Sequence, residues 1–385
     1  MIETITSGED FEALAPEWDD LVRAMPRPSP FMLHGWLAEW WAHYGDGAEL
    51  AVHAARRGDR LLGALPLVVR RRAGLRVATF MGGRLSVLPD VLLAPGEDVT
   101  HELVERIPGT CDVVDFHGLP AFSRISAALG PRLDVIQRIE APVLDLTGGW
   151  DAVYRAKTNS KKRNLHKRRR RQLAELGELE VVTARTLDAL EPALEDAFEL
   201  HAKRWEGRPD GSGFATATGR RFHRAALGRL AASDHARIVT LRLDGRAIAF
   251  HYYFALADSM YVHRLAFDPD PELARFSPGL VNTLDAIAAA SEEGLGRVEF
   301  LGGDERYKLE LADGFAPLCH AFGVTSGPRA RAYAAAHTGT IRLRMRLKRS
   351  PRLRQLYFEG MAPVRRLASA GSQKFVRAGG ARRPR

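Results

Sequence analysis

The chain has 385 residues, of which 45% are hydrophobic and 27% charged, with a formal net charge of +9 at pH 7. This length is too great for one ordinary hydrophobic core, and the composition is that of a globular protein, so two folded domains are expected and a largely disordered chain is excluded. Its two cysteines, Cys111 and Cys319, lie far apart without metal-ligand spacing around them, which excludes a disulfide scaffold and predicts no metal site.

The first half predicts an α/β unit. Apolar residues at helical spacing between 11 and 22 indicate a helix, and an aromatic helix follows a proline-rich break. The expected elements are helices near 11–22 and 31–44, strands 50–56, 60–69 and 75–81, helix 99–106, strand 112–117, helix 121–129, and one or two closing strands within 135–146.

The second half predicts the same order of elements. It opens with a long basic helix, and the turn Asp244-Gly245 joins two strands of a hairpin. The expected elements are helix 150–176, strand 180–184, helices 187–205 and 219–233, strands 237–243, 246–257 and 260–267, helix 279–293, strand 297–301, a short helix at 305–311, and a last strand at 316–324.

These two halves form a weak internal repeat. We therefore expect an α/β protein with two lobes of the same kind, residues 1–149 and 150–327, each a mixed, mostly antiparallel sheet flanked by helices. Residues 328–385 are expected to form a basic tail.

Basic residues are concentrated in two segments. Residues 155–171 contain ten Lys and Arg and no acid, and residues 328–385 contain sixteen against one acid, Glu359. Such concentration indicates anionic partners for these segments rather than for the whole protein. For the first segment, a solvated helix face is the alternative to a phosphate contact. For the tail, an amphipathic element on an anionic membrane surface and a terminal helix packed on the second lobe both remain open.

The start of the chain has no basic region followed by an apolar run, so no signal peptide is predicted. No apolar stretch approaches the roughly 20 residues that a membrane helix needs. We expect a cytoplasmic protein, or one peripheral to the inner face of the membrane through its basic tail.

Residues 237–308 carry a resemblance to a known family. The segments are the turn 243–245, the strand end Ala266-Phe267-Asp268-Pro269, the helix start Phe276-Ser277-Pro278-Gly279, and Phe300 to Lys308. In this order and spacing they resemble the GNAT superfamily of N-acyltransferases, and within it the Fem-like enzymes of cellulose or exopolysaccharide biosynthesis (the CelD type). The resemblance is clearest over these residues and looser over 1–325. It implies a tandem GNAT-like fold.

The resemblance implies a binding site for acetyl-CoA or another acyl-CoA at the helix that follows the fourth strand. The first turn of a helix presents unpaired N–H groups and partial positive charge, which bind phosphate oxygens. Here Arg275 adds a charge, Ser277 can cap or donate, Pro278 presets the helix start and Gly279 permits close approach, with Phe276 in the same loop. The loop lacks the fuller glycine run of the superfamily, so an ordinary helix start remains the alternative.

The equivalent segment of the first lobe, residues 87–98, contains Asp90, Glu97 and Asp98 and no basic residue. Because acidic side chains repel phosphate, we expect this lobe to lack a cofactor site and to shape the acceptor cleft instead.

Acyl transfer from a thioester needs a hydrogen-bond donor for the developing oxyanion, a route for the acceptor's proton, and alignment. His251 and His263 are candidate bases, although a strand histidine is more often packed or on the surface. Asp304, Tyr307 and Lys308 form the second candidate cluster: Tyr307 as general acid, and Lys308 as the Fem-like lysine that meets a phosphate. The alternative for this cluster is a helix-start carboxylate with a solvated lysine.

The predicted function is acyl transfer from acyl-CoA to an unknown amine or hydroxyl acceptor. Two rivals remain: a Fem-like transferase that uses aminoacyl-tRNA, and a catalytically inactive GNAT fold that binds anions or nucleic acid. Nucleic acid is disfavoured because neither RNA-binding aromatic motifs nor a helix-turn-helix is evident.

Overall fold

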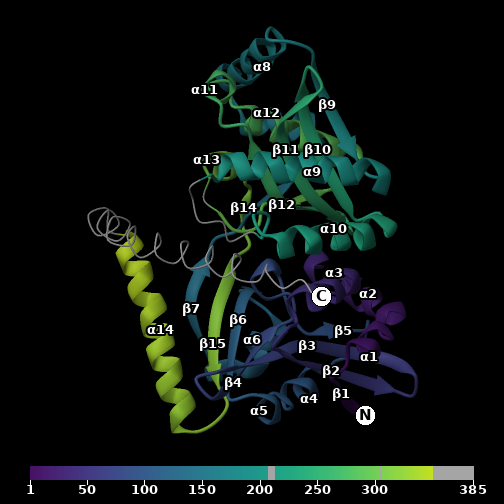
Figure 1. The fold of residues 1–385 in the computed structure, drawn as a ribbon, viewed down its shortest axis with the longest axis vertical. Helices are drawn as coiled ribbons and strands as arrows, with labels where there is room; N and C mark the ends of the chain where they lie inside the picture. The colour runs from purple at the N-terminus through teal and green to yellow at the C-terminus, as the bar shows by residue number, and fades with distance from the viewer. Residues whose placement is uncertain (207–212, 304, 350–385) are drawn as a thin grey trace, which may run out of the picture. The chain divides into compact units, whose positions relative to one another are not determined.

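Two mixed β-sheets flanked by helices make up residues 1–327, which form one compact unit (Figure 1). The predicted α/β class is therefore confirmed. The computed structural model describes residues 1–206, 213–303 and 305–349. Residues 328–385 form a second unit, whose described part is helix α14 (Pro328–Arg349). Among the described residues, no helix is long and apolar enough to cross a membrane.

The first sheet has the order β1-β2-β3-β4-β6-β15-β7, with β5 paired to β3. Its pairs are antiparallel except β4 with β6. The strands are β1 (Ile2–Ile5), β2 (Glu49–Arg57), β3 (Arg60–Arg72), β4 (Leu75–Phe80), β5 (Leu92–Leu93), β6 (Val113–Pro120), β7 (Leu133–Ile139) and β15 (Leu318–Val324).

The second sheet has the order β9-β10-β11-β12-β13-β8-β14, and only β12 and β13 pair in parallel. Its strands are β8 (Pro142–Asp145), β9 (Leu179–Ala184), β10 (Ala236–Leu243), β11 (Arg246–Leu256), β12 (Ser259–Phe267), β13 (Arg297–Glu299) and β14 (Gly314–Phe315).

The two halves of the chain exchange a strand. Strand β15 comes from the end of the second half but lies between β6 and β7 in the first sheet, where Figure 1 shows it among the blue strands. Strand β8 comes from the first half but lies between β13 and β14 in the second sheet. The expectation that 316–324 would close the second lobe, and that the closing strands of 135–146 would all stay in the first, is thus wrong. The strand orders of the two sheets nevertheless correspond, with each exchanged strand in the same place.

Helices cover both faces of each sheet, which explains why β3 and β11 are buried almost throughout. In the first sheet, α1 to α3 pack on one face and α4 to α6 on the other. In the second, α9 and α10 pack on one face and α12 on the other, with α7 and α8 against α12. The helices of the first half are α1 (Gly8–Glu12), α2 (Ala15–Arg23), α3 (His34–Tyr44), α4 (Thr100–Val104), α5 (Ile107–Thr110) and α6 (Arg124–Leu129). Those of the second are α7 (Trp150–Lys157), α8 (Ser160–Ala174), α9 (Leu187–Arg204), α10 (Ala217–Ala232), α11 (Pro271–Ala274), α12 (Pro278–Glu292) and α13 (Arg306–Leu311).

One apolar core joins the two lobes. The indole of Trp36 on α3 packs at 4.8 Å from the ring of Phe222 on α10 and at 5.6 Å from that of Phe254 on β11. At the edge of this core, Arg27 Nε donates to the almost fully buried carboxylate of Glu299 at 3.0 Å. The lobes are therefore held together by burial and by a buried ion pair.

The long basic helix expected over 150–176 is in fact two helices. The backbone of Thr158 is extended, and the side chain of Asn159 accepts the N–H of Lys162 at 2.9 Å, which caps α8. An Asn at this position satisfies an otherwise unpaired backbone donor and starts a new helix. The basic run thus lies on two helices with different directions.

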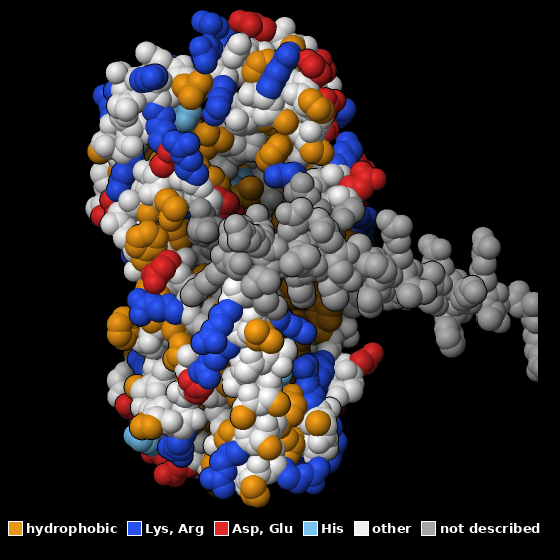
Figure 2. Space-filling model, turned by 90° about the vertical axis from the view of Figure 1, so that its left-hand side faces the viewer, with side chains coloured by type: hydrophobic (Ala, Val, Ile, Leu, Met, Phe, Trp, Pro, Cys, Tyr) orange, Lys and Arg blue, Asp and Glu red, His pale blue; other side chains and the backbone are white. Residues whose placement is uncertain are grey.

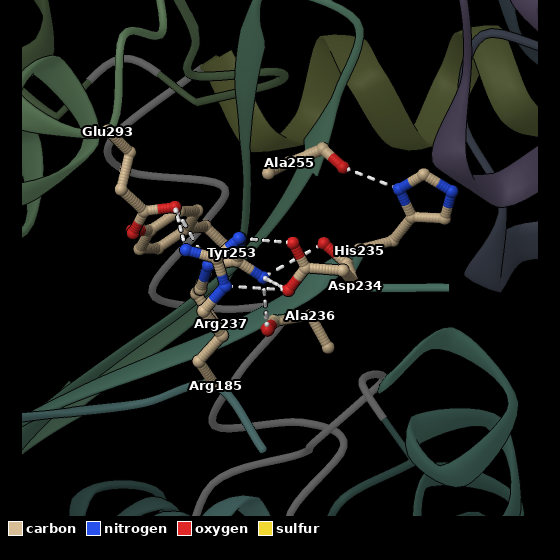
Figure 3. Close-up of polar contacts among 8 residues, drawn as sticks. All are labelled: Arg185, Asp234, His235, Ala236, Arg237, Tyr253, Ala255 and Glu293. Carbon is tan, nitrogen blue, oxygen red and sulfur yellow. Dashed lines mark hydrogen bonds and ion pairs between the residues drawn. The ribbon is translucent and has the colours of Figure 1, made fainter. Parts of the chain in front are cut away.

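A buried arginine fixes the far end of α12 (Figure 3). Arg237, at the start of β10, lies between the carboxylates of Asp234 and Glu293, with closest contacts of 3.0 and 2.9 Å. Arg185 also pairs with both acids, and the hydroxyl of Tyr253 donates to Glu293 at 3.4 Å. The last turn of α12 is therefore tied to the sheet, which sets the position of its first turn.

Candidate functional site

The parallel pair β12 and β13 separates soon after it forms. Residues Ser259–Tyr261 of β12 pair with Arg297–Glu299 of β13, and β12 then continues to Phe267 without this neighbour. A bulge in β12 lies just beyond this point, because Tyr252 and Tyr253 of β11 face Arg264 and Val262 and leave His263 as the extra residue. Bulges are over-represented next to active sites, and ligands of such sheets bind at the carboxyl ends of parallel strands.

Helix α12 begins beside this opening with a strained residue. Ser277 has φ 57° and ψ 57°, a left-handed conformation that costs a non-glycine residue on the order of 1 kcal/mol, and its side chain makes no capping hydrogen bond. Leu280 and Val281 both donate to the carbonyl of Ser277, at 3.0 and 3.1 Å. Among the described residues, the N–H of Gly279 has no partner. The helix start thus offers one free backbone donor.

Arg275 and Gly279 have structural contacts of their own. The Arg275 guanidinium is exposed, pairs with Glu272 at 2.9 Å and lies 4.7 Å over the Phe276 ring. A Cβ on Gly279 would lie 2.7 Å from the Phe267 ring, so this glycine lets α12 approach β12 closely. Arg275 and Gly279 therefore both take part in the packing of this loop.

Among the described residues, buried polar groups without partners lie on both faces of the second sheet, and one set of them lies on the face that α12 covers. Both ring nitrogens of His251, the amide oxygen of Asn282 and the hydroxyl of Tyr307 are buried and have no hydrogen-bond partner in the described part of the chain. Asn282 donates to the carbonyl of Val239, whose register partner is His251, so these two lie close together. Buried polar groups are nearly always paired, so orphans on one face mark a place for water or ligand. Asn282 was not predicted, because an Asn inside an apolar helix gives no sequence signal.

Burial keeps both His251 and Tyr307 uncharged at pH 7. Burial, together with the smaller effect of the nearby Lys308 ammonium, lowers the pKa of His251 to about 3, so this imidazole is neutral at pH 7. Burial raises the pKa of Tyr307, and the charge of Glu305 raises it further, so this phenol keeps its proton. Both groups therefore favour hydrogen-bond donation over proton abstraction.

Lys308 is a buried cation at a sharp turn. Its Nζ donates to the carbonyl of Gly302 at 3.0 Å and pairs with Glu305 at 2.9 Å. Gly303 has φ 123°, and a Cβ there would lie 2.8 Å from the lysine nitrogen, so only glycine allows this approach. Two of the three ammonium donors are thus used within the turn. Asp304, the third member of the predicted cluster, lies outside the described residues.

The structure places His263 in a different environment from His251. Its ring packs against the aromatic rings of Phe31, Trp36 and Phe254 in the core between the lobes. Burial holds its pKa well below the ordinary value for histidine. The two candidate histidines are thus not brought together, and the packed-residue alternative describes His263.

Part of the basic run packs on the same lobe. Arg170 pairs with Asp285 of α12 at 2.6 Å, and Lys162 pairs with Glu310 of α13 at 2.7 Å. A cavity of about 160 Å³ lies between α7, α8 and α12, lined by Lys167 and Arg169 among others. Figure 2 shows Lys and Arg side chains, with Asp and Glu among them, on the upper part of the molecule, where Figure 1 labels α8, and others on the lower part. Some residues of the basic run therefore form ion pairs with α12 and α13, and others line a cavity that carries positive charge.

The equivalent segment of the first lobe differs for a reason that the sequence did not show. Leu88 has φ 61° before Pro89, just as Ser277 precedes Pro278. However, the buried carboxylate of Asp90 accepts the N–H groups of Arg124 and Ile125, at 2.8 and 3.0 Å, and so caps α6. The next helix, α4, begins only at Thr100. The loop of the first lobe therefore differs from that of the second because no helix begins directly after it. The acidic side chains that the sequence showed are not the main difference.

Comparisons with known proteins agree with this geometry. Residues 160–309 match the model of the family described as the acetyltransferase (GNAT) domain, so this part of the chain is similar to that family. No curated protein matches the sequence significantly.

Solved structures similar to this chain support the fold. One is the C-terminal domain of a protein described as a lysylphosphatidylglycerol synthetase from Agrobacterium fabrum, with 14% identity, TM-score 0.54, and coverage of 87% of this chain and 97% of that one. Another is FemX, with 10% identity, TM-score 0.54, and coverage of 84% and 96%. A third is L-PGS from Bacillus licheniformis, with 10% identity, TM-score 0.52, and coverage of 86% and 96%. The predicted tandem GNAT-like fold is confirmed.

Proposed function

We propose that the second lobe transfers an acyl group from acyl-CoA to an amine or hydroxyl acceptor. The observation that carries the proposal is the set of buried polar atoms on the α12 face that lack a partner in the described part of the chain: both ring nitrogens of His251, the amide oxygen of Asn282 and the hydroxyl of Tyr307. The GNAT family match covers all three, which supports the assignment of this face to the acyl group.

The loop at the start of α12 is proposed to hold the pyrophosphate. The Gly279 N–H and the Ser277 hydroxyl would donate to one phosphate, and Arg275 would supply charge after leaving Glu272. The strained backbone of Ser277 is consistent with a functional loop, since such strain clusters at ligand sites.

Acyl-CoA would supply a thioester carbonyl at the buried polar face. Neutral His251 is suited to donate a hydrogen bond to the carbonyl oxygen as charge develops there, since a pKa of about 3 makes it a poor base at pH 7. Tyr307 carries its proton at pH 7, and we assign it the role of donating this proton to the departing thiolate. Lys308 has one ammonium donor left for a ligand oxygen and holds the Gly302–Gly303 turn. The first lobe would shape the acceptor side.

A role in exopolysaccharide, cellulose or cell-envelope biosynthesis is proposed from the sequence resemblance alone. The tail gives limited support for a membrane-bound acceptor. In α14 the apolar residues alternate with arginines, and a helical period of 3.6 places Ile341 and Met345 on one side and Leu343 on the other. The segment thus has two narrow apolar stripes. Residues 350–358, the rest of the predicted amphipathic element, lie outside the described residues.

Aminoacyl transfer is the second candidate. Two of the similar structures carry names of lysylphosphatidylglycerol synthetases and one is FemX, and each is covered over almost its whole length. The cationic cavity beside α8 would suit RNA phosphates as well as a nucleotide.

Calorimetric titration with acetyl-CoA tests the first candidate. The wild type should bind, and Arg275→Ala should weaken binding about 10-fold, as expected for one charged phosphate contact. Arg138→Ala is the matched control, because Arg138 also forms an exposed ion pair, with Glu140 in the first lobe. Unchanged affinity in Arg275→Ala would remove that residue from the site. If the wild type binds aminoacyl-tRNA and no acyl-CoA, the second candidate replaces the first.

A further inference from the structure

Three potential metal ligands meet in the first sheet, on strands that come from opposite halves of the chain. Asp115 and His117 lie on β6, and His320 lies on β15, the exchanged strand. One ligand atom from each lies within 4.8 Å of the others. This cluster could not be found from the sequence, because more than 200 residues separate His117 from His320.

Both imidazoles point at a single carboxylate oxygen. The Nε2 atoms of His320 and His117 lie 2.6 and 3.1 Å from Asp115 Oδ1. The two rings stack with their centroids 3.6 Å apart. Burial alone would raise the pKa of Asp115, but hydrogen bonds from the two imidazoles outweigh it, so the pKa lies well below the ordinary value and the group is a carboxylate.

The strand irregularity around His320 produces this convergence. Cys319 and Ala321 of β15 pair with Leu119 and Phe116, so His117 and Gly118 both lie opposite His320 alone. Gly118 has φ 68°, which a side chain would oppose. A bulge of this kind re-aims a side chain, and here it brings His117 toward Asp115 and His320.

We propose that Asp115, His117 and His320 bind one divalent transition-metal ion of the Zn²⁺ class. Two neutral imidazoles and one carboxylate are the ligand set that such ions take at sites with an open position. A tetrahedral ion with ligands at 2.0–2.2 Å holds the ligand atoms about 3.3 Å apart, within the spacing seen here. Asp115 and His320 are buried, while the side chain of His117 is 17% exposed and gives an ion access.

The ion would tie the exchanged strand to its host sheet. Two of the ligands belong to β6 and the third to β15, so binding would oppose the departure of β15.

The test is calorimetric titration of the untagged, metal-stripped full chain with Zn²⁺, together with the visible absorption of added Co²⁺. One equivalent per chain should bind, and saturating Zn²⁺ should raise the Tm. His117→Gln and His320→Gln should each weaken binding at least about 100-fold, because loss of a ligand costs more than the 10- to 100-fold loss caused by outer-sphere changes. His101→Gln, which changes an exposed histidine of the same lobe, should bind as the wild type does.

Two outcomes would overturn the proposal: no Zn²⁺ binding by the folded wild type, or equal binding by the wild type and both ligand variants. The three residues would then be a hydrogen-bonded network only. Because His320 is buried in the exchanged strand, its variant can fail to fold, and circular dichroism will show this. In that case the more exposed His117→Gln and the imidazole NMR signals of the wild type during titration decide the question.

Discussion

At the residue scale, burial assigned roles that residue type had left open. His251 and His263 are twelve residues apart on adjacent strands, and both are almost fully buried. In the described part of the chain, both ring nitrogens of His251 lack a partner and a cation lies nearby, whereas His263 lacks a partner at Nε2 and is surrounded by aromatic rings between the lobes. The sequence predicted both histidines as candidates. The alternation of side chains along a strand does not reveal which face of the sheet packs against apolar residues and which face could receive a ligand.

Removal of the Tyr307 hydroxyl should lower kcat, because the departing thiolate loses its proton donor. Tyr307→Phe keeps the packing of the ring against Phe300, so the protein should stay folded, while kcat falls about 100-fold with little change in KM. Steady-state kinetics with an identified acceptor measures this. Tyr44→Phe, in the first lobe, is the control for loss of a hydroxyl. Wild-type kcat in folded Tyr307→Phe would make the residue structural.

Substitution of Lys308 should affect KM and stability rather than kcat. Lys308→Met keeps the length of the side chain but removes the donors to Gly302 and the charge beside Glu305. The expected result is a higher KM for the phosphate-bearing substrate and a less stable fold, because the turn at Gly303 loses its anchor. Kinetics and thermal unfolding of the same preparation separate the two effects. Unchanged KM with reduced stability would limit Lys308 to holding the turn.

His251 should make stability depend on pH. Its pKa is about 3 in the folded protein and 6.5 as an ordinary histidine, so between these values the unfolded chain binds a proton that the native protein excludes. Stability is therefore fully present above about pH 6.5 and falls as the pH drops toward 3. His53, whose pKa burial lowers to about 4 with help from Arg106, acts in the same direction.

Urea unfolding from pH 4 to 7 measures this dependence. In His251→Gln the slope of the unfolding free energy against pH, near pH 5, should be smaller by about 1.4 kcal/mol per pH unit, the contribution of one proton. His101→Gln, on an exposed histidine, is the control. An unaltered slope in His251→Gln would mean that this imidazole is not kept neutral by the fold.

At the scale of elements, capping decided where helices begin. The basic residues of 155–171 have high helix propensity and predicted one helix, but Asn159 interrupts it and caps the second. This break lets Lys162 reach Glu310 on α13 and Arg170 reach Asp285 on α12. The Asn-Ser pair was visible in the sequence, yet the partners of the basic residues were not, because they lie more than 100 residues away.

Two asparagines of α8 provide a matched test. Asn159→Ala should lower the free energy of unfolding by about 1 kcal/mol, because the N–H of Lys162 loses its acceptor. Asn164→Ala, on an exposed position inside the same helix, should raise it by a few tenths of a kcal/mol through helix propensity. Urea denaturation of both variants measures the changes. Equal effects of the two substitutions would contradict the capping assignment.

At the scale of the molecule, the exchange of β8 and β15 makes the lobes dependent on each other. A fragment 150–327 keeps β15 but lacks β6, with which β15 pairs. It also lacks β8, so Val298 of β13 loses the strand beside it. A fragment 140–317 contains every strand of the second sheet. We expect 140–317 to unfold cooperatively on heating and 150–327 to show no cooperative transition.

Circular dichroism of both fragments measures this, and a cooperative transition in 150–327 would contradict it. If exposure of the inter-lobe core aggregates both, the intact chain provides a second test. Leu144→Ala, at a fully buried residue of β8, should cost about 2–5 kcal/mol there, as large-to-small core changes do. Hydrogen exchange should then show the loss of protection in β12 and β13 of the second lobe rather than in the first.

The sequence alone determined the class of the fold, the order and approximate bounds of most elements, and the loop at 275–279 as the candidate anion site. These depend on local signals: hydrophobic period, turn residues, and glycine and proline at helix starts. Tertiary structure decided which sheet received β8 and β15, that Asn282 joins His251, and that Asp115, His117 and His320 converge. Strand pairing and buried contacts join residues far apart in the chain, and their energy depends on the burial that the whole fold creates, so no local window of sequence contains them.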